Sequence, residues 1–247
     1  MSAQSLPSSQ PLPAFLLTRQ WRDGVLRLWC ATELGPLLIR VTDVDAVCFI
    51  ERAAPTPSTR TAPRRRPVEL CTPSGDPVDA LYFTTNRALA DCRAASGSTR
   101  LYESDVRPAE RYLMERFIRA GMTVHGAVHR IGSHLEADNP QLRPAQVDPD
   151  LKAVSLDIET DGFDGAVYSI AVSMPGDERV LMRSSQAVSA PDLNIECFGD
   201  EASLLEALVR WFDAFDPDIV IGWNIIGFDL SALEKRFALH RLPFRLG

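Results

Sequence analysis

Four carboxylates lie close together in one short stretch of the chain. Residues 154–165, VSLDIETDGFDG, place Asp157, Glu159, Asp161 and Asp164 within eight positions and contain no Lys or Arg. In a β-strand alternate side chains face the same way, so Asp157 and Glu159 would share one face, about 7 Å apart along the backbone. Two carboxylates so placed repel each other unless a divalent cation lies between them. The spacing therefore predicts a metal site at Asp157 and Glu159.

The same residues imitate the opening of an EF-hand calcium loop, D-x-E-x-D-G from Asp157. The imitation fails further along, because the eighth position is Asp164 and the twelfth is Tyr168, where an apolar residue and a Glu belong. A strand, not a helix, also leads into it. Asp161 and Asp164 each precede a glycine, which is typical of a tight turn. We therefore interpret these two as turn residues.

The elements around this stretch predict where a third carboxylate lies. Val154, Leu156 and Ile158 alternate with polar residues, as in a half-buried strand. The chain continues as an antiparallel meander, an amphipathic helix from about 200 to 216, a short apolar strand DIVIGWN and a last helix from Phe228. A right-handed crossover would make DIVIGWN parallel to the first strand, and sites in such sheets collect at the carboxyl ends of strands. Asp229 is then expected to reach Asp157.

The front of the chain reads as mixed α and β. Short β-rich runs separated by Asp-Gly and Gly-Pro fill residues 14–51, and a helix is expected from Pro108 until Gly121. Residues 52–70 hold four prolines and the run Arg64, Arg65 and Arg66, which favours a solvated loop, with a basic arm on a phosphate backbone as the alternative. The proline-rich residues 136–150 mark a boundary between domains 1–148 and 149–247.

Composition limits the classes of protein. The net charge is −7, and residues 151–247 carry 16 acidic against 8 basic side chains, so this half does not grip nucleic acid by charge alone. Five scattered cysteines indicate neither a zinc knuckle nor disulfides and favour buried thiols in a cytosol. The first 21 residues show no basic region followed by a long apolar core, and no apolar run approaches 18 residues, so we expect a cytoplasmic protein with no membrane partner.

Two motifs resemble those of a known family. SLDIETDG and GWNIIGFDL are similar to the first and second exonuclease motifs, D-x-E and N-x-x-x-F-D, of family B DNA polymerases. The front segments FLLTRQWRDG and YESDVRPAERYLMERFI resemble the N-terminal domain and connecting helix of bacterial members, so the resemblance covers nearly all 247 residues. It implies an α/β chain, with an α+β N-terminal domain before an incomplete ribonuclease H-like exonuclease domain that has a mixed sheet and flanking helices.

The resemblance also implies roles for single residues. Asp157 would bridge two Mg²⁺ or Mn²⁺ ions, Glu159 would bind the one that activates water, and Asp229 would hold the second through water. Asn224 and Phe228 would position the single-stranded 3′ end of DNA. Thr160 would contact the terminal nucleotide, although its hydroxyl could equally be structural. The implied reaction is 3′→5′ proofreading, which releases 5′-mononucleotides from a primer end.

The family's third exonuclease motif, Y-x-x-x-D, is not found after Asp229, where Glu234 is the only further acidic residue. The polymerase motifs are not found either, so we expect the N-terminal part of a longer, nucleoid-associated bacterial polymerase that binds primer and single-stranded template, and a sliding clamp through other regions. Two alternatives stay open. One is a non-catalytic module that binds single-stranded nucleic acid, and the other is a self-standing exonuclease of the same superfamily.

Overall fold

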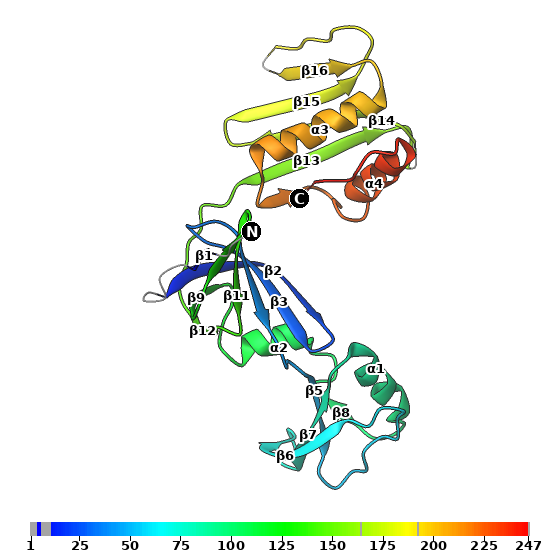
Figure 1. The fold of residues 1–247 in the computed structure, drawn as a ribbon. Coiled ribbons are helices and arrows are strands. Elements are labelled where there is room, and N and C mark those ends of the chain that lie inside the picture. Colours follow the sequence, from blue (N-terminus) through cyan, green and yellow to red (C-terminus); the bar gives the residue numbers. More distant parts are fainter. Residues whose placement is uncertain (1–3, 6–10, 164, 192, 247) are drawn as a thin grey trace. The chain divides into compact units, whose positions relative to one another are not determined.

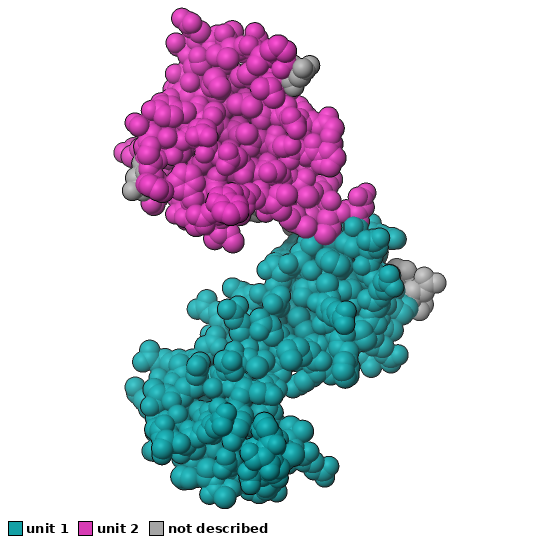
Figure 2. Space-filling view, turned by 180° about the vertical axis from the view of Figure 1, so that it is seen from behind, with its two compact units in different colours: residues 1–149 teal, residues 150–247 magenta. Residues whose placement is uncertain are grey.

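The computed structural model describes residues 4–5, 11–163, 165–191 and 193–246. Asp164, one of the expected turn residues, lies outside them. The chain divides into two compact units, Met1–Pro149 and Asp150–Gly247, coloured separately in Figure 2. The mixed α/β class expected from the sequence is confirmed, with three sheets and four helices among the described residues.

The larger sheet of the first unit has eight strands (Figure 1). In spatial order they are β1 (Gln4–Ser5), β10 (His129–Ile131), β11 (His134–Asp138), β4 (Leu37–Val41), β3 (Val25–Ala31), β2 (Leu12–Arg22), β9 (Gly121–His125) and β12 (Gln141–Pro144). Neighbours pair antiparallel except β11 with β4, which are parallel. The strand meander expected at the front of the chain is therefore present.

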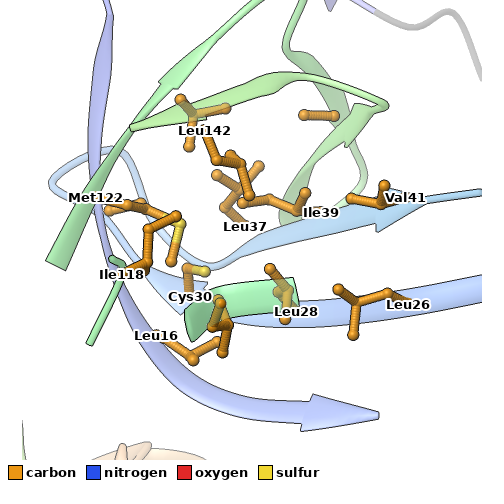
Figure 3. Packing of buried hydrophobic residues seen from close by; sticks show 14 of the residues in the cluster. Leu16, Leu26, Leu28, Cys30, Leu37, Ile39, Val41, Ile118, Met122 and Leu142 are labelled. Carbon is orange, nitrogen blue, oxygen red and sulfur yellow. The ribbon is translucent and has the colours of Figure 1, made fainter. Parts of the chain in front are cut away.

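The core of this sheet follows the strand period. Leu26, Leu28 and Cys30 alternate along β3 and are buried, and Leu37 and Ile39 of β4 are buried with them (Figure 3). Helix α2 (Pro108–Met114) packs into the same cluster. Since these residues leave water together, apolar burial fixes which face of each strand points inward.

Helix α2 is shorter than the sequence predicts. It begins at Pro108 as expected but ends at Met114, six residues before the expected limit. Phe117 adopts a left-handed backbone, φ 56°, and the Ile118 N–H donates to the Leu113 carbonyl across 2.9 Å, which closes the helix end. Gly121 then opens β9, and a Cβ there would collide with the Ala145 carbonyl. A helical pattern alone did not reveal this stop.

A second, four-stranded sheet completes the first unit, in the order β6 (Arg64–Cys71), β7 (Pro77–Phe83), β5 (Ala46–Glu51) and β8 (Leu101–Tyr102), with α1 (Asn86–Ala95) packed on it. The expectation of a solvated loop is therefore wrong for residues 64–70, which form most of β6. Arg65 donates to the buried Asp79 carboxylate across 2.8 Å, and Arg64 pairs with Asp45 across 2.7 Å. These carboxylates hold the arginines of the expected basic arm in a sheet.

The second unit is built on a five-stranded mixed sheet. Its order is β16 (Asn194–Phe198), β15 (Asp177–Arg183), β14 (Val167–Met174), β13 (Ala153–Thr160) and β17 (Ile219–Ile221). β13, β14 and β15 form the expected antiparallel meander, whereas β17 runs parallel to β13, as the crossover rule predicts. β16 was not expected, and it pairs parallel to β15.

Two helices accompany this sheet. α3 (Glu201–Phe215) lies across one face of it (Figure 1), with Leu204, Leu205 and Leu208 buried. Asp200 caps the start of α3, because its carboxylate accepts from the Ser203 N–H across 2.9 Å. α4 (Asp229–Leu239) buries Ala232, Leu233 and Phe237 in the same core. No described helix has the length and apolar character needed to cross a membrane.

Candidate active site at the end of strand β13

The alternation along β13 puts the two motif carboxylates on the open face. Val154, Leu156 and Ile158 are buried, whereas Asp157 and Glu159 are exposed. The sequence prediction of one apolar and one acidic face is thus confirmed. A register shift between Glu159 and Thr160 ends the regular pairing with β14 immediately after the acidic pair. Such bulges redirect side chains near the ends of strands.

Asp229 meets this strand from the far end of the sequence. It is the first residue of α4 and is only 1% exposed. Its Oδ1 accepts from the Ile158 N–H across 3.2 Å. β17 pairs with β13 only at Ala153, Val154 and Ser155, so the Asp229 carboxylate meets the edge of β13 beyond those pairs. The structure therefore brings Asp229 to the residue between Asp157 and Glu159.

The Asp229 carboxylate has few neighbours that stabilise its negative charge. Burial raises the pKa of Asp229 above its ordinary value, and the negative charge of Asp157 raises it further, whereas backbone hydrogen bonds from its own N–H and from Ile158 lower it. Its second oxygen, Oδ2, is buried and has no hydrogen-bond partner among the residues that the structure describes. A buried carboxylate oxygen left in this condition is costly unless a donor or cation meets it.

The donor set fits a hydrated hard cation and not a fully enclosed one. Among the described residues, no group of three or more Asp, Glu, His or Cys side chains lies close enough to hold a metal unaided. Mg²⁺ prefers oxygen ligands and keeps several of its waters, so one or two carboxylates suffice to hold it in protein sites. Asp157 and Asp229, which interact electrostatically, offer such a pair, and Glu159 lies two residues beyond Asp157.

The turn that precedes α4 places Asn224 and Phe228. Asn224 has a left-handed backbone, φ 54°, and its carbonyl accepts from the Phe228 N–H across 2.9 Å. The Asn224 side-chain oxygen lies 2.5 Å from where a Cβ on Gly227 would be, so a larger residue there would require the Asn224 side chain to move. Asn224 is exposed and Phe228 is half-buried. The turn thus presents both motif residues beside the start of α4.

The sequence reasoning gave no role to Phe163. This ring is 83% exposed in the turn after β13, and it meets the Phe228 ring edge to face, with centroids 5.9 Å apart and an interplanar angle of 88°. The signal that could have found it is an aromatic residue between two Asp-Gly pairs, where a turn alone needs no large apolar side chain. Two aromatic rings from two motifs thus lie side by side near the carboxylates.

The Thr160 hydroxyl is engaged within the chain. Its Oγ1 donates to the Gly162 carbonyl across 2.6 Å, and the Asp161 N–H donates to the Ala166 carbonyl across 3.0 Å. Both bonds shape the turn between β13 and β14. Of the two roles left open for Thr160, the structural one accounts for its hydroxyl in this structure, and a contact with a nucleotide would require this bond to be exchanged.

A mixed sheet with acidic residues at the end of a strand inside the sheet, and an aspartate supplied by a later helix, is the arrangement of a ribonuclease H-like exonuclease domain. Residues 99–245 match the family model described as DNA polymerase family B, exonuclease domain. The chain belongs to this family, as its motifs indicated.

Relatives and a solved structure agree with this assignment. The chain is 38% identical to the DNA polymerase II of Escherichia coli (strain K12) over 94% of this chain and 31% of that protein. It is 25% identical to a DNA polymerase of Archaeoglobus fulgidus over 59% of this chain and 18% of that protein. The family B DNA polymerase structure from Pyrobaculum calidifontis superposes with a TM-score of 0.71 and 18% identity, covering 95% of this chain and 33% of that chain. The chain thus spans about a third of the E. coli and Pyrobaculum polymerases.

Proposed function

We propose that the second unit is the metal-dependent 3′→5′ proofreading exonuclease of a bacterial DNA-directed DNA polymerase that acts in the cytoplasm at the nucleoid. The observation that carries the proposal is the buried Oδ2 of Asp229, which has no hydrogen-bond partner among the described residues and which feels the negative charge of Asp157. The match of residues 99–245 to the family B exonuclease model supports the reaction. The similarity of the chain to the E. coli polymerase supports DNA as the substrate. None of these observations supports a sliding clamp as a partner.

In this proposal Asp157, Glu159 and Asp229 would hold two Mg²⁺ or Mn²⁺ ions. Bound ions of this kind lower the pKa of an attacking water and stabilise both oxygens of an in-line displacement at phosphorus. Asp229 would hold its ion through water, consistent with its burial. Phe163 and Phe228 would stack on bases at the single-stranded 3′ end, and the Asn224 side-chain amide would form a hydrogen bond with the DNA strand. No covalent enzyme intermediate is required.

Titration of residues 1–247 with Mn²⁺ tests the proposed metal site. Electron paramagnetic resonance measures the free ion at each point of the titration. Asp157→Asn should weaken binding by at least about 10-fold, because it removes a charged ligand. Asp161→Asn is the matched control, since Asp161 is an exposed aspartate in the adjoining turn. Equal binding by all three proteins would refute the proposed site.

A primer with a mispaired 3′ end tests the reaction. Residues 1–247 contain three of the four carboxylates that the resemblance implies, so we expect at most trace degradation with Mg²⁺. A longer chain that includes a Y-x-x-x-D motif should degrade the primer, and Asp157→Ala in that chain should abolish degradation. Robust digestion by residues 1–247 that is lost on Asp157→Ala would show that the fourth ligand is dispensable.

A second candidate function concerns the first unit, as a module that binds single-stranded nucleic acid. A groove of about 620 Å³ there is lined by three arginines that lie over aromatic rings, at 4.9, 5.2 and 3.6 Å from guanidinium carbon to ring centroid: Arg64 over Tyr82, Arg111 over Phe49 and Arg116 over Tyr112. Alternating cations and rings are typical of single-strand grooves, although Asp43, Asp45 and Glu115 also line this one.

Salt-dependent binding of an oligonucleotide separates the two functions. Without metal, residues 1–149 should bind a single strand more tightly than residues 150–247, because the second unit carries the excess of acidic side chains. Equal or tighter binding by the second fragment would remove this candidate. Circular dichroism of both fragments shows whether each is folded.

A further inference from the structure

Glu201 is a buried carboxylate that joins three elements of the second unit. It is the first residue of α3 and is 5% exposed. Its Oε1 accepts from the Val167 N–H across 2.7 Å and from Arg236 Nε across 2.8 Å. Its Oε2 accepts from Arg236 Nη2 across 2.5 Å and lies 2.8 Å from His240 Nε2. Val167 begins β14, Arg236 lies in α4 and His240 caps the end of α4.

These partners lie on β14, which pairs with the strand that carries Asp157 and Glu159, and at the end of α4, which carries Asp229. Val167 pairs in register with Thr160, the residue after Glu159. Asp229, Leu233, Arg236 and His240 follow one another at helical spacings of four, three and four, so they share a face of α4. The Glu201 carboxylate therefore contacts β14 opposite the acidic end of β13 and, on α4, the face that also carries Asp229.

Few side-chain hydrogen bonds hold the start of α4 in place. Phe228 precedes it and has no side-chain oxygen with which to cap the helix, and the turn before it is largely exposed. Ala232, Leu233 and Phe237 bury the helix in the core. Apolar packing is not directional, whereas a two-bond contact between a guanidinium and a carboxylate fixes rotation and sliding. Besides the hydrogen bond from Ile158 to Asp229, the contacts of Glu201 thus give α4 a polar anchor at the end opposite Asp229.

We propose that Glu201 is a positioning residue for the exonuclease site, which acts through Arg236 and His240 to hold α4 so that Asp229 stays against Ile158. The proposal rests on the proposed function only in that Asp229 serves there as a metal ligand. The hydrogen bond from the Ile158 N–H to Asp229 reports the position of α4 whether or not metal binds.

The ionisation of Glu201 agrees with a permanent contact. Burial alone would raise the pKa of Glu201, but hydrogen bonds from Arg236, the Val167 N–H and His240, and the charge of Arg236, outweigh it and bring the pKa to about 2. The carboxylate is therefore charged at every pH at which a nuclease would work. It holds α4 constantly and does not switch.

Amide hydrogen exchange of residues 1–247 tests the positioning role. In Glu201→Gln, exchange at the Ile158 amide should accelerate at least about 10-fold relative to the Leu208 amide in the interior of α3, because the anchor is lost while α3 remains. Leu181→Ala is the matched control, a core truncation in β15 at a residue that pairs with Ile170 and makes none of the hydrogen bonds of the anchor. It should raise exchange at both amides together.

A second variant and a second measurement complete the test. Arg236→Lys keeps the positive charge but loses the two-bond contact, so it should reproduce the selective effect if Glu201→Gln does not fold. The Mn²⁺ dissociation constant should rise about 10-fold in either variant and stay unchanged in Leu181→Ala. Unchanged relative exchange at Ile158 in the folded variants would overturn the inference. Absence of Mn²⁺ binding in the wild type would remove the proposed metal site instead, and exchange at Ile158 would still decide the role of Glu201.

Discussion

The Ile158 N–H donates to Oδ1 of Asp229 across 3.2 Å, although 71 residues separate them in the chain. The backbone of a motif strand is thus bound directly by a carboxylate of another motif. Because Ile158 lies between Asp157 and Glu159, its amide fixes the height at which Asp229 approaches the acidic face. The contact makes the placement of Asp229 sensitive to pH, to the packing of β17 and to the position of α4.

Removing the charge of Asp229 should stabilise the protein when no metal is present. Its pKa is raised in the folded state, so the folded protein binds a proton more readily than the unfolded chain, and stability should rise as pH falls through the folded pKa. Asp229→Asn should abolish that rise and increase the free energy of unfolding at pH 7, because the buried negative charge is removed. Urea denaturation between pH 4 and 7 measures both effects.

Metal should reverse this order. Mn²⁺ that binds the folded wild type raises its free energy of unfolding by mass action, whereas Asp229→Asn should gain less. The same denaturation series with and without Mn²⁺ provides the measurement. If Asp229→Asn is less stable than the wild type without metal, the negative charge of Asp229 is stabilised more strongly than the lack of a described partner for its Oδ2 indicates.

Glu201 should have the opposite pH dependence. Its pKa is lowered from 4.5 to about 2, so its stabilisation is fully present above pH 4.5 and is lost as pH falls from there towards about 2. Glu201→Gln should lower the free energy of unfolding by about 3 kcal/mol near neutral pH and by much less near pH 2. The midpoint of urea unfolding from pH 2 to 6 checks it, and parallel curves for the two proteins would refute it.

Gly222 should tolerate no side chain. A Cβ there would lie 2.5 Å from the Leu156 carbonyl oxygen, a backbone atom of β13 that cannot move aside cheaply. Gly222→Ala should therefore lower the free energy of unfolding by about 1 to 3 kcal/mol. Gly199→Ala is the matched control, since a Cβ at Gly199 meets nothing within 4 Å. Equal thermal denaturation midpoints for the two variants would show that β17 can withdraw from β13.

Phe163→Ala should weaken the binding of the 3′-terminal base of an oligonucleotide to the second unit. Loss of an aromatic platform commonly costs about 1 to 3 kcal/mol per stacked base. An oligonucleotide with 2-aminopurine at its 3′ end, titrated against residues 1–247, reports the terminal base by its fluorescence. Phe117→Ala is the control, because Phe117 is equally exposed, at 84%, in the first unit. Matching affinities for Phe163→Ala and the wild type would remove Phe163 from the proposed site.

The parts of the fold that were predictable from sequence are those with local signals. The alternation in β13, the apolar run of β17 and the amphipathic pattern of α3 predicted these elements and, with the crossover rule, the approach of Asp229 to β13. β16 escaped prediction because its alternating pattern spans only five residues and its parallel pairing with β15 is not a hairpin.

The misread segments have partners distant in sequence. Arg65 lies in a strand because Asp79, 14 residues away, accepts its hydrogen bond, and no pattern within residues 52–70 contains that information. The same holds for Glu201, whose partners are 34 to 39 residues away. Such contacts follow from tertiary structure and are visible only once the fold is known.

The brevity of β17 has a consequence for how such a domain can change. Because β17 stops at Ile221, the amide of Ile158 is left for a side chain to bind. A mutation that extended β17 by three residues would give a more complete sheet and displace Asp229 from β13. Selection for thermal stability alone would therefore favour a longer strand, and selection for activity would keep it short. The length of one edge strand is a point at which these two pressures oppose each other.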